Sequence, residues 1–170
     1  MYDYVIQLSI NKKFQRKVNK LKNILKNNKI EDTERNWLPH ITIDIYNCGD
    51  EIEFIKRVDL IVKSIKSFYI NCNKLNDFDK KTLYIDQLNK KELLTIKEKF
   101  DKALEKYRLQ NRKSRVYKPH ITLCTNENIE AAKAIAENNF KNFVAEVKYL
   151  WVYNRNMRLI KEYKLRKKIK

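Results

Sequence analysis

The sequence predicts an α+β fold, in which one domain (residues 1–170) consists of two lobes related by an approximate twofold axis. Three observations lead to this prediction: the length suits a single hydrophobic core, strand and helix patterns alternate along the chain, and one motif is repeated. We expect each lobe to contain a small antiparallel sheet with helices packed outside it, and the two sheets to face a central cleft. The lobes would cover about residues 1–75 and 80–165, and their terminal strands can interleave.

The repeated motif surrounds the only two histidines and the only two prolines of the chain. Residues 39–42 and 119–122 both read Pro-His-Ile-Thr, 80 positions apart. The same offset aligns Tyr4–Leu8 with Tyr84–Leu88. Because this period is much longer than a solenoid unit, it indicates two duplicated lobes within one domain.

The first half of the chain reads strand, helix, strand, helix, strand. We expect strands at about 2–9, 40–46 and 68–73, and helices at about 11–28 and 51–66. The first helix is supported by apolar residues that recur mostly three or four positions apart: Phe14, Val18, Leu21, Ile24 and Leu25. We interpret this apolar face as part of the core.

The second half of the chain repeats this order. We expect strands at about 82–88, 120–125 and 143–153, and helices at about 90–109 and 128–139. The first of these helices is supported by a second apolar stripe: Leu93, Leu94, Ile96, Phe100, Leu104 and Tyr107. A final strand at about 157–165 follows the polar segment Asn154–Asn156, which suits a hairpin turn.

The charge of the chain favours anionic partners. Lys and Arg outnumber Asp and Glu by 38 to 21, a formal net charge of +17, so RNA or another phosphate-bearing substrate is the first expectation. An A/T-rich coding sequence, which enriches Lys, Asn and Ile, would explain the same excess. A hydrophobic content of 43% argues against a disordered chain. The single glycine, Gly49, excludes the glycine-rich loops of P-loop and dinucleotide-binding proteins.

The cysteines and the N-terminal segment predict a cytoplasmic protein. Cys48, Cys72 and Cys124 are widely spaced and contain no C-x-x-C pair, so we expect neither a disulfide framework nor a zinc site. Residues 1–10 lack a basic leader, and their apolar run is too short and too polar for a signal peptide or a membrane span. We expect a monomer that does not associate with membranes.

The two histidine strands carry the residues suited to catalysis. Polar and apolar residues alternate in both, which places His40 and Thr42 on one strand face, and His120 and Thr122 on the matching face of the other lobe. In-line displacement at a phosphodiester needs groups on opposite sides of phosphorus. One imidazole would remove a proton while the other supplies one, and the threonine hydroxyls would donate to the non-bridging oxygens.

Two other interpretations of these residues are weaker. A single histidine in a strand is more often structural, but duplication with identical neighbours favours phosphate chemistry. A metal site would need more ligands than two histidines, and Asp44, on the same strand face as His40, is the residue that keeps this option open. We therefore expect no metal and no cofactor.

The doubled His-Ile-Thr resembles the paired H-x-[ST] signature of the two-histidine (2H) phosphoesterases, in the branch of 2′-5′ RNA ligase-like and 2′,3′-cyclic phosphodiesterase proteins. Length, motif spacing, lobe order and duplication agree over nearly the whole chain. The resemblance implies that His40 and His120 are the general acid and base, in an order left open, and that Thr42 and Thr122 bind phosphate. Family members commonly have a basic residue shortly after the second motif, where this chain has Cys124.

Four further residues are candidates for substrate binding. Trp37 and Tyr117 stand three positions before the histidines, where an aromatic ring can stack on a nucleobase or pack in the core. Gln7 and Gln87 take matching places in apolar strands, which favours a polar cleft and hydrogen bonds to ribose or base. Six cations near strand ends can guide an anionic substrate or form a solvated surface: Lys12, Lys13, Arg112, Lys113, Arg115 and Lys118.

The functional hypothesis is a metal-independent phosphodiesterase that hydrolyses 2′,3′-cyclic phosphate ends or 2′-5′ linkages of RNA or oligonucleotides. The same groups suit hydrolysis of cyclic oligonucleotide messengers, and RNA ligation is the reverse reaction. A module that binds RNA ends without catalysis is the alternative from another class. Binding alone, however, would tolerate Lys or Arg in place of both histidines.

Overall fold

The computed structural model describes residues 2–30, 32, 37–87 and 90–167. Its strands are β1 (Tyr4–Ile10), β2 (His40–Tyr46), β3 (Phe68–Phe78), β4 (Thr82–Gln87), β5 (Ile121–Thr125), β6 (Phe143–Asn154) and β7 (Leu159–Lys164). Its helices are α1 (Lys12–Asn27), α2 (Glu51–Val62), α3 (Lys91–Ala103), the 3₁₀ turn η1 (Glu105–Tyr107), α4 (Gln110–Lys113) and α5 (Ile129–Asn139). Every strand predicted from the sequence is present. Across these residues, no helix has the length and apolar character needed to cross a membrane.

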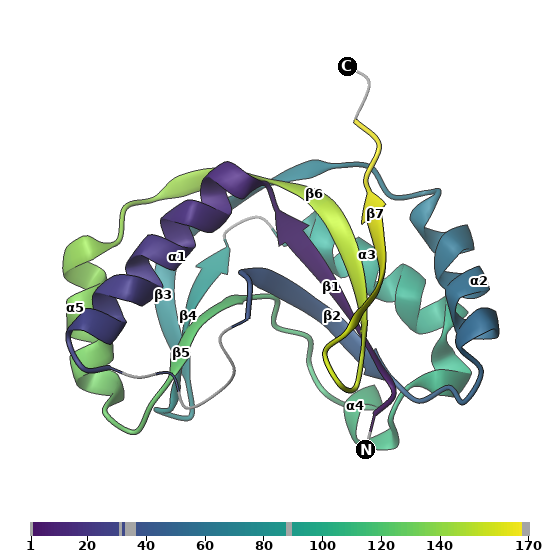
Figure 1. Cartoon of the computed structure of the whole chain (residues 1–170), viewed down its shortest axis with the longest axis horizontal. Helices are drawn as coiled ribbons and strands as arrows, with labels where there is room; N and C mark the ends of the chain where they lie inside the picture. The colour runs from purple at the N-terminus through teal and green to yellow at the C-terminus, as the bar shows by residue number, and fades with distance from the viewer. Residues whose placement is uncertain (1, 31, 33–36, 88–89, 168–170) are drawn as a thin grey trace.

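The seven strands form one antiparallel sheet in the order β2-β1-β6-β3-β4-β5, with β7 paired to β6. The sheet bends into an arch with α2 and α3 outside one arm and α1 and α5 outside the other (Figure 1). The predicted α+β class, with helices outside the sheet, is confirmed. The two expected sheets are joined into one because β6 is long. Its residues Phe143–Val147 pair with β3, and Val147–Asn154 pair with β1.

Each arm of the arch combines elements from both halves of the sequence. β3 joins β4 and β5, while β6 joins β1 and β2. The helices exchange in the same way, since α1 packs against α5 and β5, and α3 packs against α2 and β2. The twofold relation therefore maps β1 onto β4, β2 onto β5 and β3 onto β6.

The structural repeat differs from the sequence alignment in the central strands. Thr42 pairs with Gln7, and Thr122 pairs with Tyr84. The two threonines are 80 positions apart in the sequence, but their partners in β1 and β4 are only 77 positions apart. The alignment of Tyr4–Leu8 with Tyr84–Leu88 is therefore wrong by three positions, and residue 88 lies outside the described residues. The prediction failed because β1 is buried at every position and β4 has only six residues, so neither strand shows a polar face long enough to fix a register.

The hydrophobic core lies between the sheet and the helices. The apolar face predicted for α1 is confirmed by the burial of Val18, Leu21 and Leu25. On the histidine strands, Ile41 and Ile121 are fully buried, whereas the positions on either side of them are partly exposed. The predicted alternation is therefore present over residues 40–43 and 120–123, but it is wrong beyond Ile43, where Asp44 is buried and Ile45 is partly exposed because the strand bulges there.

Two predicted helices are longer than the observed ones, and one predicted strand is shorter. The helix expected at 90–109 ends at Ala103, because the chain turns to meet the end of β2, where Asn47 N–H donates to Tyr107 O at 2.7 Å. The helix expected at 51–66 ends at Val62. The strand expected at 68–73 continues to Phe78, which brings the end of β3 to the site described next.

Candidate active site

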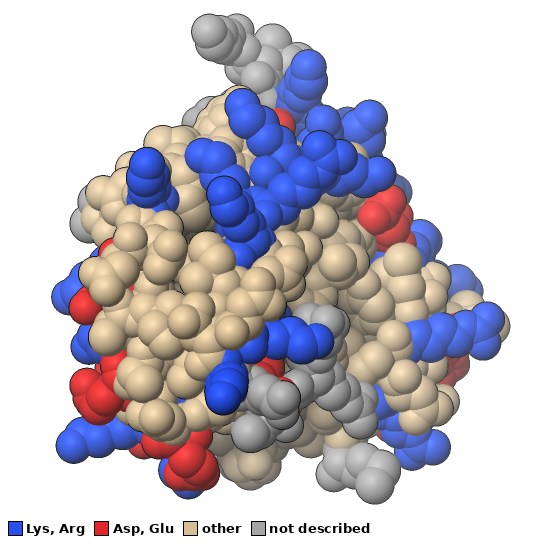
Figure 2. All heavy atoms as spheres, turned by 60° about the vertical axis from the view of Figure 1, so that its left-hand side comes forward, with Lys and Arg blue, Asp and Glu red and all other residues tan. Residues whose placement is uncertain are grey.

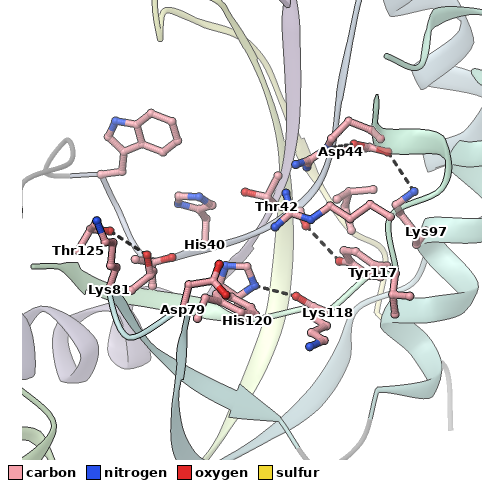
Figure 3. A pocket seen from close by; sticks show the side chains of 18 of the residues that line it. His40, Thr42, Asp44, Asp79, Lys81, Lys97, Tyr117, Lys118, His120 and Thr125 are labelled. Atoms are coloured by element: carbon pink, nitrogen blue, oxygen red, sulfur yellow. Dashed lines mark hydrogen bonds and ion pairs between the residues drawn. The ribbon is translucent and has the colours of Figure 1, made fainter. Parts of the chain in front are cut away.

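A cavity of about 850 Å³ between the two arms of the arch brings both histidine strands together. His40, Thr42, His120 and Thr122 all line it, and Figure 3 shows the imidazole rings of His40 and His120 within it. The other lining residues are Lys22, Asp32, Trp37, Leu38, Ile43, Asp44, Phe78, Asp79, Lys81, Thr82, Lys97, Arg112, Arg115, Val116, Tyr117, Lys118 and Thr125. The predicted pair of motifs thus shares one cavity.

Both imidazole rings are held in the same way. His40 Nδ1 lies 2.7 Å from Leu38 O, and His120 Nδ1 lies 2.7 Å from Lys118 O. A carbonyl oxygen only accepts hydrogen bonds, so each Nδ1 carries a hydrogen and donates it. This leaves Nε2 of each ring as the atom that can exchange a proton with a substrate.

The electrostatic surroundings of the two histidines differ. Burial lowers the pKa of His40 to about 4; the Leu38 carbonyl opposes this shift, and the charges of His120 and Lys22 add to it. Burial also lowers the pKa of His120, and Arg115 and Arg112 act in the same direction, but the Asp86 carboxylate raises it. Both rings are therefore mainly neutral at pH 7 in the free protein. Within the described part of the chain, only His120 of the two rings has a carboxylate, Asp86, among the groups that shift its pKa, and this carboxylate favours the protonated ring.

The threonines lie beside a β-bulge in each strand. In β2 the pairing with β1 skips Ile43, and in β5 the pairing with β4 skips Leu123. Bulges of this kind re-aim neighbouring side chains and are common next to active sites. In β2 the backbone receives further support, because the Tyr117 hydroxyl donates to Thr42 O at 3.1 Å.

The two predicted aromatic residues both line the cavity but have different contacts. The Trp37 ring lies 5.5 Å from the His40 ring, tilted by 37°. Tyr117 uses its hydroxyl to hold Thr42 O, and the Lys97 ammonium lies 5.6 Å from its ring centre. Trp37 is therefore the better placed of the two to meet a nucleobase.

Sequence reasoning missed a third aromatic residue, Phe78. Its ring lies edge-on to His120 at 4.8 Å and stacks on Tyr84 at 4.2 Å. It precedes the three-residue turn 79–81, in which Asp79 and Lys80 have φ angles of 50° and 54°, a left-handed conformation that tight hairpin turns use. The repeat could not reveal Phe78, because an offset of 80 places its counterpart at Arg158, which is not aromatic.

The two predicted glutamines do not reach this cavity. Gln7 and Gln87 are both buried, and neither belongs to the residues that line it. In the sheet Gln7 pairs with Thr42, whereas Gln87 pairs with Cys72, so they do not occupy matching places. This expectation rested on the alignment that is wrong by three positions.

A buried ion cluster forms the wall of the cavity beyond Thr42. Asp44, only 2% exposed, contacts Lys97 Nζ at 3.0 Å, Arg108 Nε at 3.3 Å and Arg112 Nε at 3.1 Å. Asp101 pairs with the same Lys97 and Arg108. Sequence reasoning missed Lys97 and Arg108 because buried cations are rare and leave no periodic signal.

These contacts decide the charge state of Asp44. Burial raises its pKa, but the Ile45 N–H and the Lys97 ammonium outweigh burial and hold the pKa below its usual value. Asp44 is thus an ionised partner of cations rather than a vacant ligand. In the described part of the chain, no three His, Cys, Asp or Glu side chains are grouped as a metal site.

Three of the six predicted cations line the cavity: Arg112, Arg115 and Lys118. The other three, Lys12, Lys13 and Lys113, are not among its lining residues. Lys22, Lys81 and Lys97 also line it and were not predicted. Figure 2 shows that Lys and Arg gather on the outer surface as well, so the basic character is not confined to the cavity.

Comparison with known proteins gives one family and a consistent fold. The family model described as the 2′-5′ RNA ligase superfamily matches residues 11–157. The structure of E. coli LigT complexed with phosphate is similar at a TM-score of 0.65 and 11% identity, over 98% of each chain. LigT complexed with 3′-AMP gives 0.66 and 13% identity, over 96% of this chain and 98% of LigT.

TT0787 of Thermus thermophilus gives a TM-score of 0.67 and 10% identity, over 98% of this chain and 100% of the other. At these identities the structural matches establish the shared fold. No curated protein matches the sequence.

Proposed function

Since the chain belongs to the 2′-5′ RNA ligase superfamily, we propose that it is a phosphodiesterase for 2′,3′-cyclic phosphate ends or 2′-5′ linkages of RNA and oligonucleotides. The observation that carries this proposal is the pair of imidazoles in one cavity, each with Nδ1 held by a backbone carbonyl and Nε2 left for substrate. The surrounding cations favour an anionic substrate.

In the proposed reaction, His40 is the general base and His120 the general acid. His40 Nε2 takes a proton from water as the water oxygen bonds to phosphorus. The bond from phosphorus to the 2′ or 3′ oxygen breaks, and His120 Nε2 gives its proton to that oxygen. The Thr42 and Thr122 hydroxyls donate to the non-bridging oxygens as their charge grows.

The pKa values support this division of roles. A base must be neutral before reaction, and the pKa of about 4 makes His40 neutral over most of the pH range. An acid must carry a proton, which the Asp86 carboxylate favours at His120. The negative charge of a bound phosphodiester raises the pKa of both rings and therefore helps His120 to remain protonated.

The test is a substrate panel in EDTA, read by mass spectrometry. The protein is incubated with 2′,3′-cyclic mononucleotides, with 2′-5′ oligoadenylate and with cyclic oligonucleotides, and each expected product corresponds to hydrolysis of one phosphodiester bond. Loss of all turnover on chelation would exclude the metal-free mechanism. Tight RNA binding without turnover of any phosphodiester would instead favour the module that only binds RNA ends.

A further inference from the structure

The ion cluster around Asp44 contains an arginine for which the proposed acid and base chemistry has no use. Arg112 Nε lies 3.1 Å from Asp44 Oδ1, and the Arg112 side chain is 25% exposed and lines the cavity. A guanidinium at the wall of a cavity either forms an ion pair that only stabilises the fold or binds an anionic ligand. The partners of Asp44 distinguish these alternatives.

Asp44 is already compensated without Arg112. Lys97 Nζ lies 3.0 Å and Arg108 Nε lies 3.3 Å from Asp44 Oδ2. Asp101 is shared by the same two cations. Three cations therefore face two carboxylates, and one positive charge stays unbalanced beside the cavity. Leaving a partly buried charge unbalanced is unfavourable until an anion arrives.

The wider surroundings do not supply that anion. Glu105 contacts Arg108 Nη1 at 3.4 Å, but it also pairs with Lys113 at 2.9 Å. The charges of Glu105 and Lys113 cancel, so the cluster still has one more positive charge than negative charges. The surplus therefore belongs to the cluster as a whole.

The guanidinium of Arg112 is bound to the protein through its Nε atom. Its Nε pairs with Asp44, and its backbone carbonyl accepts from Arg108 Nη2 at 3.2 Å. Within the described residues, no other bond engages the terminal Nη1 and Nη2 atoms. The anchored side chain therefore presents a pre-organised pair of donor groups, which is the geometry that phosphate oxygens bind best.

The cluster occupies one side of the reacting centre. Asp44 is two positions beyond Thr42, across the bulge at Ile43, and Figure 3 shows Thr42 between His40 and Asp44. The equivalent residue in the other arm is Cys124, which is 1% exposed and uncharged. A single strand of nucleic acid that crosses the cavity thus meets this ion cluster on the Asp44 side of the histidines, and no equivalent of it at Cys124.

We propose that Arg112 binds the phosphodiester that neighbours the reacting phosphate, so that the protein selects oligonucleotides over mononucleotides. This inference rests on the proposed function, because it assumes that the histidines hold the reacting phosphate. Asp44 is a positioning residue, since it acts on substrate through Arg112. The selected substrate class is an RNA strand of two or more nucleotides.

The experiment compares three substrates that end in a 2′,3′-cyclic phosphate: a mononucleotide, a dinucleotide, and the same dinucleotide with an uncharged methylphosphonate linkage. Arg112→Gln removes the charge but keeps a polar side chain. We expect it to raise KM for the ordinary dinucleotide about tenfold, the scale of one charge-assisted hydrogen bond. Loss of the Arg112 charge also raises the pKa of His120, and this acts on kcat equally for all three substrates. KM for the other two substrates should not change.

The matched control is Arg57→Gln. Arg57 also pairs with a carboxylate, Glu53, at 2.9 Å, but it does not line the cavity, so all three KM values should stay at the wild-type level. Thermal unfolding confirms that both variants fold. An equal rise of KM on all three substrates, or no rise on any, would overturn the proposal.

Calorimetric binding of hydrolysed products separates this inference from the proposed function. We expect Arg112→Gln to weaken binding of a dinucleotide with a terminal 3′-phosphate and to leave the mononucleotide product unaffected. If the wild-type protein turns over none of the three substrates but shows this binding difference, the proposed function fails and the assignment of Arg112 stands. Equal binding losses for both products would contradict the assignment.

Discussion

The two histidine strands have the same residues but different surroundings. In β2 and β5, each Nδ1 donates to the carbonyl two residues earlier at 2.7 Å, and each threonine is followed by a bulge. The strand opposite β2 places Ser9 against His40. The strand opposite β5 continues from the pair of Ile85 and Ile121 to Asp86, whose carboxylate acts on His120.

Under the proposed mechanism, this difference would let a duplicated motif perform two tasks. The twofold relation supplies two identical proton carriers to one cavity, and identical surroundings would give them equal affinity for a proton. Acid–base catalysis needs one ring neutral and the other protonated at the same pH. The neighbouring strands, rather than the motifs themselves, provide that inequality.

The largest expected effect comes from removing either histidine. His40→Ala and His120→Ala should each lower kcat/KM for a 2′,3′-cyclic nucleotide by about 10²–10⁴-fold, because each deletes one proton-transfer step. Initial rates give the effect, and thermal unfolding serves as the folding control. Full activity in either single variant would mean that one histidine suffices, and the proposed division of acid and base between the two strands would be wrong.

A substrate whose leaving group needs no proton separates the two roles. With bis(p-nitrophenyl) phosphate, His120→Ala should lose less than about tenfold, because p-nitrophenolate departs without an acid. His40→Ala should still lose about 10²-fold or more, because water must still be deprotonated. Release of p-nitrophenolate measures both variants. The opposite result would exchange the assignment of acid and base.

The threonines should be closer to equal than the histidines. Thr42→Val and Thr122→Val each remove one donor to the non-bridging oxygens, and each should lower kcat by about 10²-fold. Steady-state kinetics on the cyclic mononucleotide checks this. A loss confined to one variant would show that the reacting phosphate binds to one strand only.

The repeat made the four central residues predictable, whereas their supports were not. His40, Thr42, His120 and Thr122 are short-range features, because alternation along a strand fixes which side chains share a face. Lys97 could not be found in this way. It is 7% exposed within an otherwise amphipathic α3, and its burial depends on Asp44, which approaches from another element.

Strand register and the contacts of the β3–β4 hairpin also depend on residues far apart in the sequence. The offset of 77 between β1 and β4 is set by the pairing of Gln7 and Tyr84 with the two threonines, which apolar patterns alone do not encode. Phe78 reaches His120 because β3 runs five residues further than predicted, and the signal for this was limited to a polar turn after an apolar position.

The pH dependence of kcat/KM should report the inequality between the rings. In the proposed mechanism, the productive free protein has His40 neutral and His120 protonated. Activity therefore rises with pH through the His40 pKa of about 4 and falls as pH passes the His120 pKa, which burial keeps below 6.5. The optimum should lie on the acidic side of 6.5, the ordinary histidine value.

Asp86→Asn tests whether Asp86 sets the alkaline limb of this pH profile. Without the carboxylate that raises the His120 pKa, the alkaline limb should move to lower pH, and the rate at pH 7 should fall. Asp77→Asn is the control, because Asp77 pairs with Lys133 at 3.7 Å and is not among the residues that line the cavity. An alkaline limb that stays in place would show that Asp86 does not distinguish the two strands.

The smallest effect is expected from Tyr117→Phe, because it removes only a support of the β2 backbone. Loss of the 3.1 Å bond to Thr42 O should lower the free energy of unfolding by about 1 kcal/mol. Urea unfolding measures this loss, and Tyr69→Phe, at a tyrosine 65% exposed, should not change stability. We expect kcat to fall less than that of Thr42→Val, with KM unchanged. A loss of kcat as large as that of Thr42→Val would place the Tyr117 hydroxyl on the substrate itself, and the asymmetry between the strands would then extend to direct phosphate contacts.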